Sequence, residues 1–240
     1  MTKKIIVLQL YPRDMNIYGD WGNVLTIKRR LEWRGYEVDL REYNLGDTFP
    51  QDVDIIIGGG GQDSGQARIG EDLLTLGPTL KRLAEKDVPM LVICGLYQQF
   101  GHFFKTKDGH TIQGIGILDV ETYGSDIRMI GNIVTHSDEF GDIVGYENHS
   151  GQTTLGPNAT PLAKVILGAG NNDHDGHEGA RYRNVIGSYL HGSLLPKNPE
   201  IADFLIGEAI KRKFDDVLVS LERETDYTDY AREIAMKRPR

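Results

Sequence analysis

The chain has 240 residues, of which 39% are hydrophobic and 26% are charged. That balance is typical of a globular protein and excludes a disordered one, and the length is enough to bury a large apolar core in one or two domains. The formal net charge is −8. An acidic surface repels phosphate backbones, so the composition gives no indication of nucleic-acid binding.

The sequence contains one cysteine, Cys94, which cannot form an internal disulfide. This argues against a secreted, disulfide-stabilised scaffold. The apolar run at 5–10 is too short for a signal peptide and has no small-residue cleavage site. No stretch approaches the roughly 18 apolar residues of a membrane span. We therefore expect a cytoplasmic protein with no membrane insertion.

Strands and helices alternate in the first half of the sequence. Short β-branched or apolar runs predict strands at 5–10, 36–43, 53–57 and 89–93. Apolar residues spaced by three and four predict helices at 22–35 and at roughly 70–86. This alternation predicts an α/β fold with a doubly wound, mostly parallel sheet and flanking helices.

The second half of the sequence changes character. Residues 111–146 are rich in β-branched residues and glycine, which predicts an antiparallel β section with hairpins. A further strand is predicted at 185–190, and a helix at 198–213 with Pro199 near its first turn and a basic C-terminus. The charge-dense residues 214–240 are predicted to be a C-terminal extension that forms a surface helix or a frayed tail.

Cys94 is the first candidate for chemistry. It follows the strand predicted at 89–93 and precedes 95–101, a segment that can begin a helix. Ligands of open α/β sheets bind at the carboxyl ends of strands, and a strand-to-helix turn presents a side chain there, as the nucleophile elbow of serine hydrolases does. A helix N-terminus also stabilises a thiolate. The alternative is an inert, buried cysteine, so a nucleophile requires a base and an oxyanion site as well.

The candidate base is His191, at the end of the strand predicted at 185–190. Two strand ends of one sheet can bring a thiol and an imidazole to hydrogen-bond distance although they are far apart in the sequence. A histidine that caps a loop is the alternative. His149 is the one serious rival as a base, since the other five histidines lie in polar or loop-like segments: His102, His110, His136, His174 and His177.

A run of four glycines, 58–61, follows the strand predicted at 53–57. Such a run lets the backbone approach a ligand and point N–H groups at it, so we expect an oxyanion site there, with the Gly95 N–H as a second donor. No Gly-Lys-Ser/Thr follows, so the run is not a P-loop, and its spacing is not that of a dinucleotide fingerprint. A flexible turn is the alternative.

The segment at 171–177, Asn-Asn-Asp-His-Asp-Gly-His, resembles a metal-binding cluster. It contains no cysteine and has no regular periodicity, so we favour a solvated loop over a metal site. We expect no metal and no cofactor in this chain.

Taken in order, these features resemble the class I glutamine amidotransferases of the CobB/CobQ-like type. Among these, the resemblance is to the amidotransferase subunits of MurT/GatD-type lipid II isoglutaminyl synthases. It covers about 18–198 and rests on Tyr18-Gly19-Asp20-Trp21-Gly22-Asn23, Gly59-Gly60-Gly61-Gln62-Asp63, Ile93-Cys94-Gly95-Leu96-Tyr97-Gln98, Gly114-Ile115-Gly116-Ile117-Leu118, Gly145-Tyr146-Glu147-Asn148-His149, Gly170-Asn171-Asn172 and Tyr189-Leu190-His191-Gly192. The resemblance assigns 1–213 to the amidotransferase domain.

The resemblance implies a glutaminase. Cys94 would attack the side-chain amide of glutamine and release ammonia, and water would hydrolyse the glutamyl thioester to glutamate while His191 carries the protons. Arg128 stands at the position of the family's glutamine-binding arginine, where a guanidinium suits the substrate α-carboxylate. The other substrate-binding residues implied are Gln98, Gly60, Gly61, Gly95, Asn148 and His149.

The resemblance also implies a partner. Ammonia would pass to a MurT-like, Mur-ligase-type synthetase that uses ATP and Mg²⁺ to amidate the D-glutamate α-carboxyl of lipid II, a lipid-linked acceptor. Cobyrinate-type relatives fuse the synthetase to the amidotransferase domain. The 240 residues of this chain leave no space for such a domain and contain no P-loop, so we expect ATP on another chain and a hetero-oligomer.

Two positions depart from the family pattern. Leu96 stands where the family usually has glycine, and a leucine there could crowd the turn or reshape the glutamine pocket. The sequence His191-Gly192-Ser193 lacks the acid that many class I members carry two residues after the histidine. The carboxylate that orients His191 must therefore come from elsewhere in the chain or, as the resemblance suggests, from the partner. We expect weak glutaminase activity alone and stronger activity in the complex.

Three other functions stay open from the sequence. A stand-alone thiol amidase or γ-glutamyl hydrolase would keep Cys94 and His191 but need no synthetase. An ammonia donor to a different synthetase would keep the same glutaminase chemistry. A non-catalytic binding module would reuse the fold with an unreactive thiol, although the cysteine, the glycine run and the histidine at strand ends argue against it.

Overall fold

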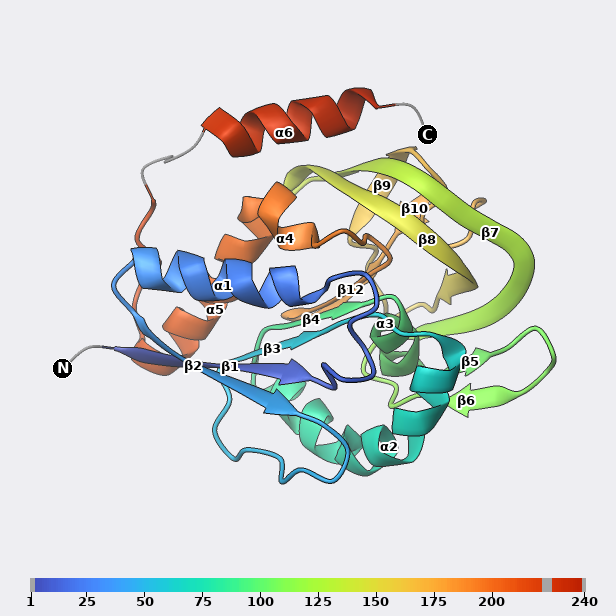
Figure 1. Cartoon of the computed structure of the whole chain (residues 1–240), viewed down its shortest axis with the longest axis horizontal. Coiled ribbons are helices and arrows are strands. Elements are labelled where there is room, and N and C mark those ends of the chain that lie inside the picture. Colours follow the sequence, from blue (N-terminus) through green and yellow to red (C-terminus); the bar gives the residue numbers. More distant parts are fainter. Residues whose placement is uncertain (1–2, 222–225, 239–240) are drawn as a thin grey trace.

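The computed structural model describes residues 3–221 and 226–238, which contain two six-stranded sheets and their flanking helices (Figure 1). The first sheet has the order β11-β12-β4-β3-β1-β2. Its strands are β1 (Lys4–Leu10), β2 (Glu37–Tyr43), β3 (Ile55–Gly58), β4 (Met90–Ile93), β11 (Ala180–Tyr182) and β12 (Val185–Ser188). All neighbours are parallel except β11 and β12. The predicted doubly wound, mostly parallel sheet is confirmed.

Helices cover both faces of this sheet. They are α1 (Trp21–Trp33), α2 (Asp63–Glu85), α3 (Gly95–Phe100), α4 (Leu194–Lys197) and α5 (Pro199–Phe214). Helices α1 and α5 pack together on one face, and α2 lies on the other (Figure 1). The basic residues 211–213 form the last turn of α5, as predicted.

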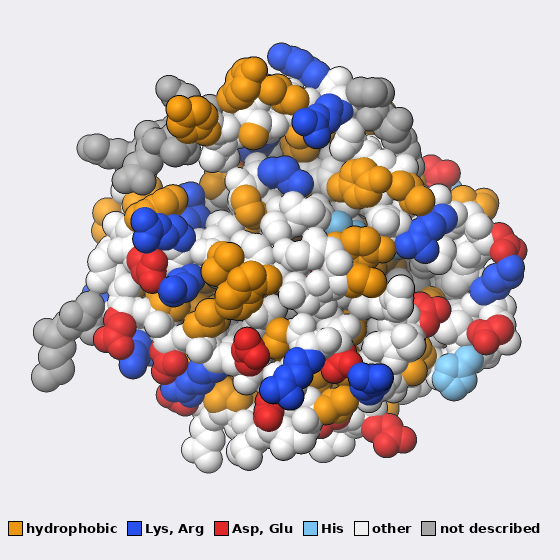
Figure 2. All heavy atoms as spheres, in the orientation of Figure 1, with side chains coloured by type: hydrophobic (Ala, Val, Ile, Leu, Met, Phe, Trp, Pro, Cys, Tyr) orange, Lys and Arg blue, Asp and Glu red, His pale blue; other side chains and the backbone are white. Residues whose placement is uncertain are grey.

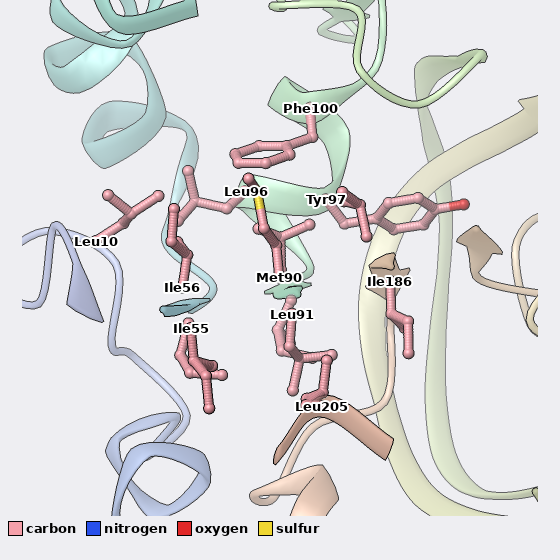
Figure 3. Packing of buried hydrophobic residues seen from close by; sticks show 14 of the residues in the cluster. Leu10, Ile55, Ile56, Met90, Leu91, Leu96, Tyr97, Phe100, Ile186 and Leu205 are labelled. Carbon is pink, nitrogen blue, oxygen red and sulfur yellow. The ribbon is translucent and has the colours of Figure 1, made fainter. Parts of the chain in front are cut away.

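The core lies between these layers. Strand β4 is buried along its whole length, as a central parallel strand covered on both faces should be. Leu96 and Phe100 of α3 pack on one side of Met90 and Leu91, and Leu205 of α5 packs on the other (Figure 3). This core fixes the carboxyl end of β4, where Cys94 lies.

Helix α2 begins earlier than the sequence predicted. The prediction placed its start at Gly70, but the helix begins at Asp63, directly after the glycine run. Asp63 lies in the first turn, where a carboxylate complements the helix dipole. Gln66 and Ile69 on the same early turns are buried, so tertiary packing offsets the low helix propensity of Gly65 and Gly70.

The second sheet has the order β10-β9-β7-β5-β6, with β8 paired to β7. Its strands are β5 (Phe103–Lys105), β6 (Thr111–Gln113), β7 (Val120–Ser137), β8 (Gly141–Leu155), β9 (Ala163–Leu167) and β10 (His177–Glu178). Strands β7 and β8 form a long antiparallel hairpin whose register shifts between Gly124 and Met129. The predicted antiparallel section is confirmed and extends further along the chain.

The C-terminal segment includes helix α6 (Asp226–Lys237), which lies over α4 and the β7–β8 hairpin (Figure 1). Arg232 of this helix pairs with Glu200 of α5 at 3.3 Å. The predicted surface helix is therefore present, while 222–225 and 239–240 lie outside the described residues. Within the described part of the chain, no helix is both long and apolar enough to cross a membrane.

Candidate active site

Cys94 occupies a sharp turn between β4 and α3. Its backbone has φ 50° and ψ −104°, a conformation that side-chain-bearing residues rarely adopt and that is stored at functional sites. The turn is held from both sides, because the Cys94 N–H donates to Ser188 O at 2.9 Å and the Gln98 N–H donates to Cys94 O at 3.0 Å. The predicted elbow geometry is present, and its strain presents the thiol at the carboxyl end of the sheet.

His191 lies beside this turn. It follows β12, and its backbone N–H donates to Tyr146 O at 2.7 Å, which ties it to β8. A Cβ built on Gly60 would lie 3.0 Å from both Cys94 Cβ and His191 Cε1. Cys94 Cβ and His191 Cε1 are therefore separated by at most twice 3.0 Å. The structure brings the two residues and the glycine run to one edge of the sheet.

The glycine run makes the close approach of these groups possible. A Cβ on Gly61 would lie 2.5 Å from Met15 Sδ, and one on Gly95 would lie 2.8 Å from Met15 Cε. The Gly61 N atom is 3.1 Å from the same Gly95 position. The Gly60 N–H donates to Asp20 Oδ2 at 2.8 Å. The amides of Gly61 and Gly95 therefore lie together beside Cys94, while the Gly60 N–H is already hydrogen-bonded to Asp20.

Gln98 forms part of a buried hydrogen-bond network. Its Oε1 accepts from Gln66 Nε2 at 2.7 Å, and its Nε2 donates to the Tyr189 hydroxyl at 3.0 Å. Gln66 also donates to Gly95 O at 2.9 Å. His149 stacks on Tyr189 with ring centroids 3.6 Å apart. These contacts fix the floor of the site and hold Gln98 close to the thiol.

Arg128 lies on β7 inside the segment where the hairpin register shifts. Its Nε donates to Asn148 Oδ1 at 2.8 Å, and its Nη2 donates to the Tyr18 hydroxyl at 3.3 Å. The ring of Tyr18 in turn packs against His191 with centroids 4.2 Å apart. The guanidinium is exposed, so it can meet a carboxylate that enters from solvent.

A cavity of about 380 Å³ opens next to Cys94. Six of the predicted site residues line it: Gly61, Cys94, Gln98, Arg128, Asn148 and His149. Gly60, Gly95 and His191 are not among its lining residues. His191 is 1% exposed, because Tyr18 lies against its ring. The cavity therefore reaches Cys94 and Arg128, and the imidazole of His191 lies behind Tyr18.

Burial sets the resting protonation of the site. It raises the pKa of the Cys94 thiol to about 12 and lowers the pKa of His191 to about 3 and that of His149 to about 4. The Gly95 N–H opposes the shift at Cys94 but does not reverse it. The expected stabilisation of a thiolate is therefore outweighed by burial, and the resting pair is a neutral thiol and a neutral imidazole.

Neither ring nitrogen of His191 has a hydrogen-bond partner among the described residues. A buried imidazole usually forms at least one such bond. Within the described part of the chain, no acidic side chain therefore forms a hydrogen bond with His191 in place of the acid that the sequence lacks after it.

Leu96 points away from the cavity and is fully buried in the core. Its Cδ1 would be 2.5 Å from a Cβ on Gly58, so the glycine accommodates the leucine (Figure 3 shows Leu96 among the core residues). Leu96 does not line the cavity, so it makes no direct contact with the space where we expect glutamine to bind.

The segment at 171–177 is an internally bonded loop. Asn172 Oδ1 accepts from the backbone N–H groups of His174 and Asp175, and its Nδ2 donates to Asp175 Oδ2 at 2.7 Å. Asn171 is buried and bonds to Gly179. Among the residues with described positions, no group of three histidine, cysteine or acidic side chains is arranged to hold a metal ion.

The sequence reasoning assigned no role to four residues that the structure places at the site: Tyr18, Asp20, Gln66 and Tyr189. Tyr18 and Asp20 lie in one of the segments that carry the family resemblance, which was the available signal. Tyr189 lies in another of these segments and in the strand predicted at 185–190, whereas Gln66 precedes the helix predicted at 70–86 and gave no signal. Only the fold shows that both residues meet at Gln98.

The chain is similar to known glutamine amidotransferases. The family of CobB/CobQ-like glutamine amidotransferase domains matches residues 5–199. The GatD subunit of a lipid II isoglutaminyl synthase (glutamine-hydrolyzing) from Staphylococcus aureus is 43% identical over 201 residues, covering 83% of this chain and 82% of the relative. The corresponding subunit from Streptococcus pneumoniae is 35% identical over 235 residues, covering 93% and 90%.

A solved glutamine amidotransferase from Thermotoga maritima has the same fold. It aligns with a TM-score of 0.52 at 15% identity, covering 96% of this chain and 90% of that one. From the family match over most of its length and the two relatives, the chain belongs to the CobB/CobQ-like glutamine amidotransferase family.

Proposed function

We propose that this chain is the glutaminase subunit of a lipid II isoglutaminyl synthase. The observation that carries the proposal is the convergence of Cys94, His191 and the glycine-run amides at one sheet edge, beside a cavity that Arg128 lines. The two GatD relatives, each covered over four-fifths or more of its length, support the choice of reaction.

Glutamine enters with its α-carboxylate on Arg128 and its side-chain amide at Cys94. His191 takes the thiol proton as the sulfur attacks the amide carbon, and the oxyanion forms beside the Gly61 and Gly95 N–H groups. The imidazolium then protonates the leaving nitrogen and ammonia departs. Water, deprotonated by His191, attacks the thioester. The imidazolium then returns the proton to the departing sulfur, which releases glutamate and regenerates the free thiol.

The thiol proton must pass from Cys94 to His191 as attack begins. A thiol with a pKa of about 12 and an imidazole with a pKa of about 3 favour the neutral forms. An added acid beside His191 would stabilise the imidazolium and speed this proton transfer. The unpartnered ring nitrogens of His191 support a carboxylate supplied by a partner subunit.

The surface near the site suits such a partner. Four large apolar side chains are exposed there: Ile17, Ile127, Ile130 and Tyr146. Ile17 lines the cavity, and Tyr146 accepts the backbone N–H of His191. Figure 2 shows hydrophobic side chains where the loop before α1 meets the β7–β8 hairpin. Exposed apolar groups around a site are typical of a protein interface.

The partner we propose is a MurT-like, Mur-ligase-type synthetase. It would bind ATP and Mg²⁺, receive the ammonia and amidate the D-glutamate α-carboxyl of lipid II. The complex would act in the cytoplasm on its lipid-linked acceptor. In this scheme the present chain contributes glutamine hydrolysis and holds no cofactor of its own.

Reconstitution tests the proposal. The chain is mixed with the MurT-like synthetase of the same genome, ATP, Mg²⁺, glutamine and lipid II, and both glutamate release and amidated lipid II are measured. We expect faster glutamate release in the complex and one amidated product per glutamate. Equal glutaminase turnover with and without the synthetase would contradict the partner-supplied acid and favour a stand-alone amidase.

A further inference from the structure

Asp20 is a buried carboxylate that the mechanism above does not use. It lies at the N-terminus of α1 and is 1% exposed. Its Oδ2 accepts the Gly60 N–H at 2.8 Å, while its Oδ1 has no hydrogen-bond partner among the described residues. A buried carboxylate oxygen without a partner is costly, so its retention calls for an explanation.

Distances measured from Gly60 show that Asp20 lies close to Cys94 and His191. The Cβ position on that glycine lies 3.0 Å from Cys94 Cβ, 3.0 Å from His191 Cε1 and 3.7 Å from Asp20 Oδ2. A Cβ on the preceding Gly59 would lie 2.7 Å from the same oxygen. The Asp20 carboxylate therefore lies next to the side chains of Cys94 and His191. It can approach them because Gly59 and Gly60 have no side chains.

The charge of Asp20 acts on the two reactive groups in opposite directions. It raises the pKa of Cys94 and so disfavours the thiolate. By the same Coulomb interaction it favours a cation on His191. The sulfur is anionic as attack begins and again as it leaves the thioester, whereas the imidazolium persists through both tetrahedral intermediates. A negative charge that stabilises the imidazolium therefore favours both the acylation and the deacylation steps.

Other charged groups surround the site as well. Arg128 on β7 disfavours charge on His191 and favours it on Cys94, and Asp63 at the start of α2 disfavours the thiolate. His149 on β8 has a pKa of about 4 and is neutral at pH 7. Of these groups, Asp20 and Asp63 are the anions, and Asp20 is the buried one.

We propose that Asp20 is a positioning residue for glutamine hydrolysis, which holds the glycine run through the Gly60 N–H and provides a negative charge that stabilises the His191 imidazolium. This inference rests on the proposed glutaminase function. It differs from the partner-supplied acid, because Asp20 supplies charge without a hydrogen bond to the ring.

Two substitutions separate the two parts of this role. In the Asp20→Asn variant, the amide oxygen can still accept the Gly60 N–H, so the glycine run stays in place while the charge is lost. Asp20→Ala removes both. We expect kcat for glutamate release to fall roughly tenfold in the Asn variant with KM within about twofold of wild type, and to fall further in the Ala variant.

A second readout distinguishes electrostatics from simple damage. Alkylation of Cys94 by iodoacetamide requires the thiolate, which the charge of Asp20 disfavours. The Asn variant should therefore be alkylated at least as fast as wild type although it hydrolyses glutamine more slowly. The matched control is Asp54→Asn, a buried aspartate before β3 that pairs with Arg212 and Lys213 away from the site. It should keep wild-type kcat and KM.

The pH dependence of the wild-type chain gives a test without a variant. Burial raises the pKa of Asp20 to about 6, so its charge is lost as pH falls through that value. We expect kcat to decline below about pH 6 and the Asn variant to lack this step. A wild-type kcat that stays flat from pH 7 to pH 5 overturns the role of Asp20.

The outcomes separate the two proposals. An Asn variant that hydrolyses glutamine with the wild-type kcat and pH profile overturns the role of Asp20 and leaves the glutaminase function standing. A wild-type chain that releases no glutamate, with or without its synthetase, overturns both. Parallel loss of hydrolysis and alkylation in the Asn variant would reduce Asp20 to a structural group.

Discussion

The ring of Tyr18 packs against the imidazole of His191 with ring centroids 4.2 Å apart. The hydroxyl of the same tyrosine accepts a hydrogen bond from Arg128 at 3.3 Å. One side chain therefore covers the proposed base and contacts the proposed carboxylate ligand. Tyr18 is therefore the residue that links the proposed carboxylate ligand to the proposed base.

Two variants of Tyr18 separate these contacts. Tyr18→Phe keeps the ring on His191 and loses the contact with Arg128, so we expect KM for glutamine to rise about two- to fivefold with little change in kcat. Tyr18→Ala also uncovers the imidazole and should lower kcat. Steady-state glutamate release measures both parameters. An Ala variant with the same kcat as wild type would show that the ring does not influence the base.

Arg128 should determine glutamine affinity. Its guanidinium is exposed at the cavity and is held by Asn148 at 2.8 Å. Because charge-assisted hydrogen bonds contribute about 1.5–3 kcal/mol, Arg128→Ala should raise KM on the order of 10- to 100-fold. Arg29→Ala, which removes an exposed arginine of α1, is the matched control and should leave KM unchanged. An unaltered KM in the Arg128 variant would place the substrate carboxylate elsewhere.

Leu96 should matter for stability and not for substrate binding. Its side chain is fully buried against Gly58 and lies outside the cavity. Leu96→Ala should lower the free energy of unfolding by about 2–5 kcal/mol, measured by denaturant titration, with KM for glutamine within about twofold of wild type. A large rise in KM without loss of stability would mean that the leucine shapes the pocket after all.

Glu178 should make stability depend on pH. It is fully buried on β10, and burial raises its pKa from 4.5 to about 8. In the folded chain, Glu178 is therefore protonated and uncharged at neutral pH. Its contribution to the free energy of unfolding is fully present below pH 4.5 and is lost as pH rises through about 8. Glu178→Gln removes this loss and should be more stable than wild type at pH 8 by on the order of 2 kcal/mol.

Thermal or denaturant unfolding at pH 5 and pH 8 checks this prediction. The Gln side chain can keep the acceptor for Ser188 Oγ and the Tyr189 N–H. A stability difference between variant and wild type that does not grow between the two pH values would show that Glu178 ionises normally in the folded chain.

Much of this architecture was predictable because its signals are local. The apolar run that forms β4 and the turn at Cys94 lie within a few residues, so periodicity and the strand-to-helix change predicted both. The two sheet types followed from the change in composition along the chain. The end of β12 before His191 was predicted for the same reason.

Other features depend on contacts between distant segments. Asp20 meets Gly60 across 40 residues, and Gln98 meets Tyr189 across 91. The spacing of residues along the sequence does not predict these pairs. The early start of α2 at Asp63 and the raised pKa of Cys94 also depend on burial by other elements. These features needed the fold, whereas the choice of Cys94 and His191 as the candidate nucleophile and base did not.

The central claim is that Cys94 forms a covalent glutamyl intermediate. It is tested most directly by incubating the chain with a chloroketone analogue of glutamine and locating the adduct by mass spectrometry. We predict one adduct, on Cys94, that excess glutamine prevents, with glutamate release lost in parallel and absent from a folded Cys94→Ala protein. An unlabelled Cys94, or a Cys94→Ala protein that still hydrolyses glutamine, would contradict the account.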